Sequence, residues 1–503
     1  MTIASMETSS PLYAVVDLGS NSFHMLITRQ LADSVQVVDR VKRKVRLAAG
    51  LDEKNILSEQ AMAKGLECLN FFAERLQDIP TENIRIVATA TLRLALNRAD
   101  FIAKAETILA NKIIILSGIA EAEHIYLGVA HTSFSANKRL VLDIGGASTE
   151  LIVGHGFTVK IAHSLNLGCV TYNQRYFVDG SLTDENFSRA ISAAEQTIAT
   201  IKADFINIGW QCVLGGSGTM QALAEILTYQ HKPSVLSLDF LYEVRAQLQK
   251  FSNINSINLP GLSTERSPVI ASGLAILIAL FQQLSIRELS LSSGALREGL
   301  LYEMLPNSRT INIRQRTISA LSQRFHIDQQ HADSVKQQVS AIYSQLKTTW
   351  HLPDGNALEI LLASSDLHEI GLLLEYKYHR QHSAYILTHA DLAGFNQSER
   401  QLLVTFVSLY KGDVEQALLE NQSAISTENT IKLLIILRLA VILCRRRKDD
   451  KLPSYQITVS DKVLNLLLPK AWIIQHALIS DELKQENDHL NRLGHTLNIT
   501  YQN

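Results

Sequence analysis

Two short segments of the chain repeat the same pattern of residue types. Residues 15–22 read VVDLGSNS and residues 141–148 read VLDIGGAS, each an apolar run followed by Asp, one apolar residue, Gly, two small or polar residues and Ser. The apolar run predicts a buried strand, and the glycine and serine after it predict a tight turn. Backbone N–H groups in such a turn can point outward at an anion, so both segments are candidate phosphate-binding loops.

The aspartates of these loops, Asp17 and Asp143, indicate a bridging role. A carboxylate cannot bind phosphate directly, because like charges repel, but it can hold a divalent cation or orient a water molecule that bridges to phosphate. Two such loops that face each other would clamp a chain of phosphates. The alternative is two unrelated strand–turn units in a large α/β protein, since Asp-x-Gly turns are common. The repetition in a matching context favours the clamp.

The matching context is the order of predicted elements after each loop. After the first loop, hydrophobic alternation and periodicity predict strands 23–29 and 35–45, helix 58–77 with Ser58 as N-cap, strand 84–88, helix 100–109, strand 113–116 and helix 121–131. After the second loop the predicted elements are strands 149–153 and 157–163, helix 183–205 and strand 212–214. Duplicated halves of this kind imply a two-lobed α/β architecture with the ligand at the junction.

Composition and charge exclude several classes of protein. The 503 residues are 46% hydrophobic and 19% charged with a formal net charge of −2, which argues against nucleic-acid binding. The four cysteines have no metal-binding or CxxC spacing, so we expect a reducing cytoplasm. The first residues have neither a basic start nor an apolar core, so we expect no signal peptide. The segment 433–444, read as the most hydrophobic of the chain, is shorter than the roughly 20 residues that span a bilayer, so we expect no membrane contact.

The texture of the sequence changes near residues 305–308. Before this point strands and helices alternate and glycines cluster, whereas after it the pattern is nearly all helical and rich in Leu, Gln and His. We therefore expect three domains, with residues 1–130 and 131–306 as the two lobes and residues 307–503 as a helical C-terminal region.

Six motifs run through the first two expected domains in the order DLGSNSFHML, ATATLR, SGIAEAE, DIGGASTEL, GGSGT and SGALREG. In this order they resemble the exopolyphosphatase/guanosine pentaphosphate phosphohydrolase (Ppx/GppA) family. The resemblance implies an α/β fold with duplicated actin/Hsp70/sugar-kinase-like (ribonuclease H-like) lobes and a mostly α-helical C-terminal region. LHEIG and HRQHSAYIL in the C-terminal half also fit. RKVRLAAGL and LRLAVILCRRRKDD resemble the guanosine pentaphosphate branch more closely than the polyphosphate branch.

The resemblance implies a phosphoanhydride hydrolase of the stringent response that uses Mg²⁺. The expected reaction removes the terminal 5′-phosphate of guanosine pentaphosphate (pppGpp) and leaves guanosine tetraphosphate (ppGpp), in a cytoplasmic homodimer. Two alternatives stay open. One is an exopolyphosphatase that releases phosphate from long-chain polyphosphate, which has the same terminal anhydride, and the other is a non-catalytic guanosine-nucleotide sensor. A kinase of the same superfold would need an adenosine site and an acceptor pocket, and the ordered motifs argue against it.

Three acids match those to which the resemblance assigns the chemistry. Glu121 matches the base that activates water, and a carboxylate at the start of a helix facing the first loop can accept that proton. Glu150 matches the second essential acid, and Asp143 and Glu150 are the expected Mg²⁺ ligands. The alternatives are a favourable acid at a helix N-terminus and a surface glutamate on a strand. The chain departs from the family pattern around the base at Ile119, Ala120 and Glu123.

Turn amides and a few cations are expected to bind the phosphates. The expected ligands in the repeated loops are Asp17, Gly19, Ser20, Asn21 and Ser22 on one side and Gly145, Gly146, Ala147 and Ser148 on the other. A third loop, made of Gly216, Ser217, Gly218 and Thr219, opens a helix whose free N–H groups can face an anion, the alternative being tight packing of strand on helix. Arg93 resembles the family's phosphate-contacting arginine, whose guanidinium can grip two phosphate oxygens.

A row of cations follows the first loop. Arg40, Lys42, Lys44 and Arg46 alternate in a predicted strand and would share one face. Such a row is usually a solvated face, but in this family Lys42 and Lys44 are candidates to meet the 3′-diphosphate of the nucleotide.

Histidines cluster in the C-terminal half, at His368, His379, His382 and His389. The LHEIG segment resembles a degenerate HD-type metal phosphohydrolase, with Glu369 where an active one has Asp, so no working binuclear metal site is expected. The region is expected to form a wall of the cleft and part of a dimer interface. The run 445–448 is expected to close a helix, where positive charge suits the helix dipole.

Overall fold

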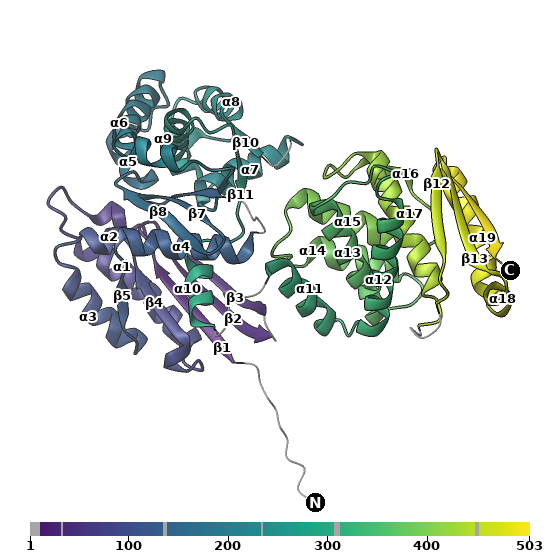
Figure 1. Ribbon diagram of the computed structural model, residues 1–503. Helices are drawn as coiled ribbons and strands as arrows, with labels where there is room; N and C mark the ends of the chain where they lie inside the picture. The colour runs from purple at the N-terminus through teal and green to yellow at the C-terminus, as the bar shows by residue number, and fades with distance from the viewer. Residues whose placement is uncertain are drawn as a thin grey trace, which may run out of the picture. The chain divides into compact units, whose positions relative to one another are not determined.

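The computed structural model describes residues 11–31, 34–133, 138–232, 235–305, 312–447 and 452–502. The chain divides into two compact units, Met1–Ile313 and Arg314–Asn503, each with its own hydrophobic core (Figure 1). Part of the predicted boundary, residues 306–308, lies outside the described residues. The first unit contains both repeated loops and therefore carries the candidate site.

The first sheet of this unit has the strand order β3-β2-β1-β4-β5. β1 (Leu12–Leu18), β2 (Ser22–Leu31) and β3 (Ser34–Lys44) are antiparallel neighbours, and β4 (Ile84–Ala88) and β5 (Ile113–Ile115) run parallel to β1. Its helices are α1 (Glu59–Leu76), α2 (Ala90–Leu94) and α3 (Arg98–Leu109). Ser58 caps α1 as predicted, because its Oγ accepts a hydrogen bond from the N–H of Ala61 at 3.3 Å.

The second sheet repeats this topology in the order β10-β11-β9-β6-β7-β8. β6 (Arg139–Ile144), β7 (Thr149–His155) and β8 (Thr158–Leu165) are antiparallel neighbours, and β9 (Cys212–Gly215) is parallel to β6. β11 (Glu288–Leu291) lies parallel to β9, as β5 lies beside β4, and β10 (Val235–Ser237) adds an antiparallel edge. The helices are α5 (Cys169–Tyr176), α6 (Asp184–Ile208), α7 (Gly218–Tyr229), α8 (Leu238–Leu248) and α9 (Ser267–Leu284). The repeat is the duplicated actin-like, ribonuclease H-like fold that the motifs imply.

Both Asp-x-Gly segments lie at the carboxyl end of the first strand of their sheet. Asp17 is opposite His24 in the β1–β2 hairpin, and Asp143 is opposite Glu150 in the β6–β7 hairpin. Because β4 is parallel to β1 and β9 is parallel to β6, the segments that follow β4 and β9 emerge at the same sheet edges as the two repeated loops. The carboxyl edge of such a sheet is where α/β proteins bind ligands.

Two helices contribute to a core shared by the two sheets. α4 (Gly118–Thr132) contacts β7 and β8, and α10 (Leu296–Met304) contacts β1 and packs against α4 (Figure 1). The helices approach closely, since a Cβ on Gly128 would lie 2.0 Å from the carbonyl oxygen of Ala295. α4 begins at Gly118 with Ser117 as its N-cap, so the prediction that Glu121 starts the helix is wrong by three residues. Ser117 caps the helix earlier by accepting from the N–H of Ala120.

Among the described residues, one helix, α9, is long and apolar enough to cross a membrane. Most of its residues are buried in the core of the first unit, where it packs against α5, α6, α7 and α8. A helix covered on every side needs no polar face, which explains its composition. The sequence analysis considered 433–444 and did not single out this helix.

The second unit contains a three-stranded sheet that the sequence analysis did not predict. β13 (Val463–Pro469) lies between antiparallel β12 (Gln456–Ser460) and parallel β14 (Thr496–Gln502). The expectation of a nearly all-helical region is wrong here, although the strand signal is present, since Leu464, Leu466 and Leu468 alternate inward. The helices are α11 (Ile313–Arg324), α12 (Gln329–Leu346), α13 (Asn356–Leu367), α14 (His379–His389), α15 (Gln397–Leu409), α16 (Gln416–Glu420), α17 (Thr427–Leu443), α18 (Lys470–Gln475) and α19 (Ala477–Arg492).

The contact between α4 and α10 should be intolerant of any side chain at Gly128. Gly128→Ala is expected to lower the free energy of unfolding by about 1–3 kcal/mol, the range for overpacking, because the added Cβ would overlap backbone. Denaturant titration measures the change. Gly156→Asn is the control, since nothing lies within 4 Å of its Cβ position and asparagine tolerates its φ of +57°. Equal stability of Gly128→Ala and the native chain would contradict the close packing.

Candidate active site

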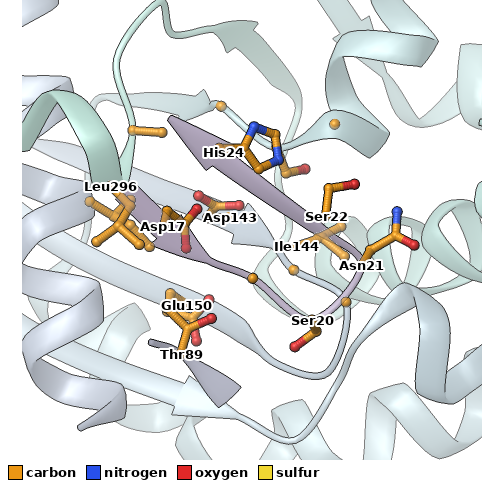
Figure 2. A pocket seen from close by; sticks show the side chains of 18 of the residues that line it. Asp17, Ser20, Asn21, Ser22, His24, Thr89, Asp143, Ile144, Glu150 and Leu296 are labelled. Atoms are coloured by element: carbon orange, nitrogen blue, oxygen red, sulfur yellow. The ribbon is translucent and has the colours of Figure 1, made fainter. Parts of the chain in front are cut away.

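A cavity in the first unit collects residues from both sheets (Figure 2). Most of the predicted site residues line it: Asp17, Gly19, Ser20, Asn21, Ser22, Lys42, Glu121, Asp143, Gly145, Gly146, Ser148, Glu150, Gly216, Ser217 and Gly218. The predicted residues that do not line it are Lys44, Arg93, Ala147 and Thr219. The fold thus brings together three loops that are far apart in the sequence.

Four carboxylates converge on this cavity. Asp17 and Asp143 come from the two hairpins and are partly open to the cavity, whereas Glu150 and Glu121 are 1% and 7% exposed. Burial raises the pKa of Asp17 to about 6, and burial together with the charge of Asp17 raises the pKa of Asp143 to about 7. Burial and the neighbouring acids raise the pKa of Glu150 well above its usual range. The four groups therefore cannot all ionise without a compensating positive charge.

Glu121 and Glu150 each accept a hydrogen bond from a neighbouring side chain. Arg93 donates from Nη1 to Oε2 of Glu121 at 3.0 Å and to the carbonyl oxygen of Leu116 at 2.8 Å. Ser164 donates from Oγ to Oε1 of Glu150 at 2.8 Å. Burial raises the pKa of Glu121 to about 7, although the hydrogen bond and charge of Arg93 oppose the shift. A carboxylate with this pKa suits proton transfer near neutral pH.

The two repeated loops touch each other. A Cβ on Gly146 would lie 2.8 Å from Cβ of Ser20 and 3.4 Å from the backbone nitrogen of Asn21. The carbonyls of Gly145 and Gly146 accept hydrogen bonds from the N–H groups of Cys169 and Val170 at the start of α5, at 3.0 and 2.9 Å. These carbonyls are thus turned toward α5, and the N–H of Gly145 donates to the carbonyl of Ser148 at 2.8 Å, so the amides of 146–148 are the ones that can turn to the cavity.

The third loop ends at the amino terminus of α7. The side chain of Ser217 is 5% exposed, and its Oγ has no hydrogen-bond partner among the described residues. Gly218 lies against the guanidinium of Arg266, so that a Cβ there would overlap it. Thr219 is buried beneath the loop against Gly273, which explains why it does not line the cavity.

A wall of positive side chains faces the acids, and most of it was missed from the sequence. The cationic and imidazole groups that line the cavity are His24, Arg40, Lys42, Arg266 and Arg297. Arg297 lies within the SGALREG motif and His24 within the DLGSNSFHML motif, although neither residue was singled out, whereas no quoted motif covers Arg266. Nη1 of Arg297 lies 3.0 Å from Nδ1 of His24. Burial and the surrounding cations lower the pKa of His24 to about 3, so His24 is neutral and accepts that hydrogen bond.

The predicted cationic row is only partly correct. Arg40 and Lys42 line the cavity and pair with Glu298 and Glu265 at 3.5 and 3.6 Å. Nζ of Lys44 donates to the backbone carbonyl of Glu265 at 2.9 Å and does not line the cavity. Arg46 lies beyond the end of β3 with a φ of 57°, so it is not on the strand face as predicted. The strand ends at Lys44, one residue before its predicted end, and the chain turns there.

The predicted histidines of the second unit are separated. His368 lies with His331 and Glu369 in a group whose potential ligand atoms are within 4.8 Å of one another, and Arg447 donates to Glu369 at 2.5 Å. The other three have partners elsewhere: His379 contacts Tyr410, His382 contacts Glu375 and His389 contacts the carbonyl of Tyr385. The run at 445–447 follows α17 rather than closing it, with Arg445 paired to Glu482, and Lys448 lies outside the described residues.

The acids fit a divalent cation. Oδ1 of Asp17 is buried without a hydrogen-bond partner in the described part of the chain. Carboxylate oxygens are the ligands that Mg²⁺ prefers, and a cation among Asp17, Asp143 and Glu150 would neutralise charges that now raise one another's pKa.

Comparison with known proteins gives matches over nearly the whole chain. A model of the Ppx/GppA phosphatase family matches residues 26–308, and a model of Ppx/GppA phosphatase domain III matches residues 313–487. The chain is 49% identical over 483 residues to the guanosine-5′-triphosphate,3′-diphosphate pyrophosphatase of Pseudoalteromonas translucida, covering 96% of this chain and 97% of the relative. It is 44% identical over 495 residues to the protein of the same name from Vibrio cholerae, covering 98% and 99%.

Solved structures show the same fold at low sequence identity. An exopolyphosphatase from Cytophaga hutchinsonii superposes with a TM-score of 0.54 and 22% identity, covering 60% of this chain and 99% of the other. An exopolyphosphatase-like protein superposes with a TM-score of 0.53 and 23% identity, covering 58% and 97%. At this identity the likeness concerns the fold alone.

The raised pKa of Asp143 predicts a pH-dependent stability. An unfolded aspartate titrates near 3.8, so between about pH 4 and pH 7 the unfolded chain loses a proton that the folded chain retains. The free energy of unfolding should therefore fall as the pH rises through this window. In metal-free buffer, Asp143→Asn should be more stable than the native chain by about 2–4 kcal/mol at pH 8 and equally stable below pH 4.

Denaturant titrations at pH 4 and pH 8 check this expectation, with Asp204→Asn as the control because Asp204 is exposed on α6. Added Mg²⁺ should stabilise the native chain more than Asp143→Asn. If Asp143→Asn is no more stable than the native chain at pH 8, ionising Asp143 does not destabilise the folded chain and the prediction is wrong.

Proposed function

The chain belongs to the Ppx/GppA phosphatase family, and from this premise we propose that it hydrolyses the terminal 5′-phosphate of pppGpp, giving ppGpp and inorganic phosphate. The relatives at 43–49% identity over nearly their full length are named for this substrate. The reaction belongs to the nucleotide metabolism of the stringent response. We place the enzyme in the cytoplasm as a homodimer, with lobes at 1–130 and 131–306 and a C-terminal domain at 307–503.

One observation carries the proposal: four acids and a set of positive side chains line one cavity, which both repeated loops also line. The positive wall suits a chain of several phosphates, and the acids suit the attack of water on the last of them. A pocket for a neutral substrate would need neither.

Glu121 is the proposed base. Its carboxylate takes a proton from the attacking water while the water oxygen bonds to the terminal phosphorus. The anhydride bond between the last two phosphates breaks, and its electron pair leaves with the diphosphate of ppGpp. The pKa of about 7 keeps a substantial share of Glu121 ionised at neutral pH, as a base requires.

The loops and cations orient the phosphate chain. We propose that amides of 19–22 and 146–148 hold the terminal phosphate, because these loops touch each other beside the acids. Ser217 and the amino terminus of α7 offer a second set of donors. Arg40, Lys42, Arg266 and Arg297 then face the remaining phosphates.

Asp143 and Glu150 are the proposed ligands of Mg²⁺, with Asp17 beside them. When bound, the ion supplies positive charge that draws electrons from the reacting phosphate and shields it from the carboxylates.

Long-chain polyphosphate is the second candidate substrate, because its end presents the same anhydride and the positive wall does not require a guanosine. A non-catalytic sensor is suggested only by Ile119 and Ala120, and both leave the four acids in place.

Phosphate release from pppGpp with Mg²⁺ tests the function. Glu121→Gln keeps the shape of the side chain and removes the base, so kcat should fall about 10²-fold or more while KM changes little. Glu123→Gln is the matched control, since Glu123 is exposed on the same helix. Full activity of Glu121→Gln would reject the assignment of the base, and a native chain that releases no phosphate from pppGpp would reject the function.

Lys42 and Lys44 form a matched pair for substrate choice. Lys42 lines the cavity and Lys44 does not, although both contact Glu265. Lys42→Gln should raise KM for pppGpp about tenfold, as expected for losing a hydrogen bond to a charged group, and should affect short polyphosphate less. Lys44→Gln should leave both unchanged. Equal losses on the two substrates for Lys42→Gln would mean that Lys42 attracts anions generally.

A further inference from the structure

Arg93 is directed at Glu121 rather than at the phosphate loops. Its Nη1 donates to Oε2 of Glu121 at 3.0 Å and to the carbonyl of Leu116 at 2.8 Å, and its side chain does not line the cavity. The carbonyl of Leu116 comes just before α4, the helix that carries Glu121. The guanidinium of Arg93 therefore links the carbonyl of Leu116, which precedes α4, to the side chain of Glu121 on α4.

The backbone of Arg93 is itself fixed. It lies in α2, where its N–H donates to the carbonyl of Thr89 at 3.0 Å, and Arg98 donates to its carbonyl at 2.8 Å. In the same short helix, Oγ1 of Thr91 donates to Oγ of Ser20 in the first phosphate loop at 2.8 Å. α2 thus braces the first loop through Thr91 and the base through Arg93.

Only one oxygen of Glu121 is engaged. Arg93 occupies Oε2, and within the described part of the chain no hydrogen bond reaches Oε1. Since Glu121 lines the cavity, holding Oε2 fixes the plane of the carboxylate and leaves Oε1 to take the proton of a water.

We propose that Arg93 is a positioning residue that sets the orientation of Glu121, and that it does not bind phosphate. The inference rests on the proposed function, because it assumes that Glu121 is the base. It differs from the phosphate contact that the family resemblance implies for this arginine. A phosphate ligand contributes to binding whether or not the base is present, whereas a positioning residue acts only through the base.

A double-mutant cycle separates these roles. We measure kcat and KM for pppGpp in the native chain, Arg93→Met, Glu121→Gln and the double variant. Arg93→Met should lower kcat about 10²-fold, the cost of misplacing a reacting group by about 1 Å, with KM within about twofold of native. In the Glu121→Gln background, Arg93→Met should cause no further loss of kcat, since there is no base left to orient.

The opposite results would overturn the proposal. A phosphate ligand predicts that Arg93→Met raises KM at least tenfold, and that its effect multiplies with that of Glu121→Gln. Unchanged kcat and KM in Arg93→Met would show that the residue has neither role. Arg175→Met is the control, because Arg175 is an exposed arginine on α5.

Chemical rescue guards against a purely structural loss. Arg93→Ala leaves space for guanidinium ion, and added guanidinium at non-denaturing concentration should restore kcat several-fold in Arg93→Ala but not in Glu121→Gln. No rescue, together with a lowered melting temperature, would assign the residue to folding and overturn the proposal. A native chain active on polyphosphate but not on pppGpp would overturn the proposed substrate instead, and the same cycle on polyphosphate would still decide the role of Arg93.

Discussion

Mutual repulsion among four buried carboxylates is the constraint on which the structure of this site depends. Asp17, Asp143, Glu121 and Glu150 share one cavity, and burial raises the pKa of each. In an unfolded chain these carboxylates would lie apart and be hydrated, because burying a charged group without a partner is unfavourable. Here Asp17 and Asp143 are fixed on the first strands of two different sheets, while donors from other segments hold the two glutamates. The stability of the two sheets therefore maintains an arrangement of carboxylates that is unfavourable until a cation neutralises part of their charge.

The duplicated fold positions the two aspartates and the two glutamates in different ways. The hairpins supply the aspartates by symmetry, because both sheets have the same strand order around β1 and β6. The glutamates break the symmetry. Glu150 lies opposite Asp143 on β7, whereas Glu121 lies on α4, which belongs to the core shared by the two sheets. Glu121, the proposed base, thereby reaches the cavity that both repeated loops line, and Gly128 permits α4 to pack closely enough on the segment before α10.

The sequence predicted the parts of this site that a local pattern encodes. Asp17 and Asp143 follow apolar runs and precede small residues, so strand, turn and carboxylate are visible within eight positions. Glu121 was found by its motif, although the helix start was misplaced because Ser117 caps it earlier. His24 was missed although it lies in the first quoted motif, because a lone histidine in a strand does not show which side chains it will meet. Arg266 was missed because it reaches the cavity as a single side chain from a segment outside every quoted motif. The sheet β12–β14 was missed for another reason: its alternation is clear, but it interrupts a long helical region. Whether a single side chain such as Arg266 reaches the cavity depends on tertiary packing, which the local sequence pattern does not show.

The asymmetry of charge across the cavity has a consequence for which anions can be substrates. The acids repel any phosphate, and the positive side chains that line the same cavity attract it. In the proposed reaction, Lys42, Arg266 and Arg297 attract the inner phosphates of a chain and so hold its terminal phosphate at the loops beside the acids. Binding energy from groups that do not react is thereby used to bring the reacting phosphate to carboxylates that would otherwise exclude it. The same repulsion acts on the freed phosphate, which no longer has a link to the positive wall, and this favours its departure.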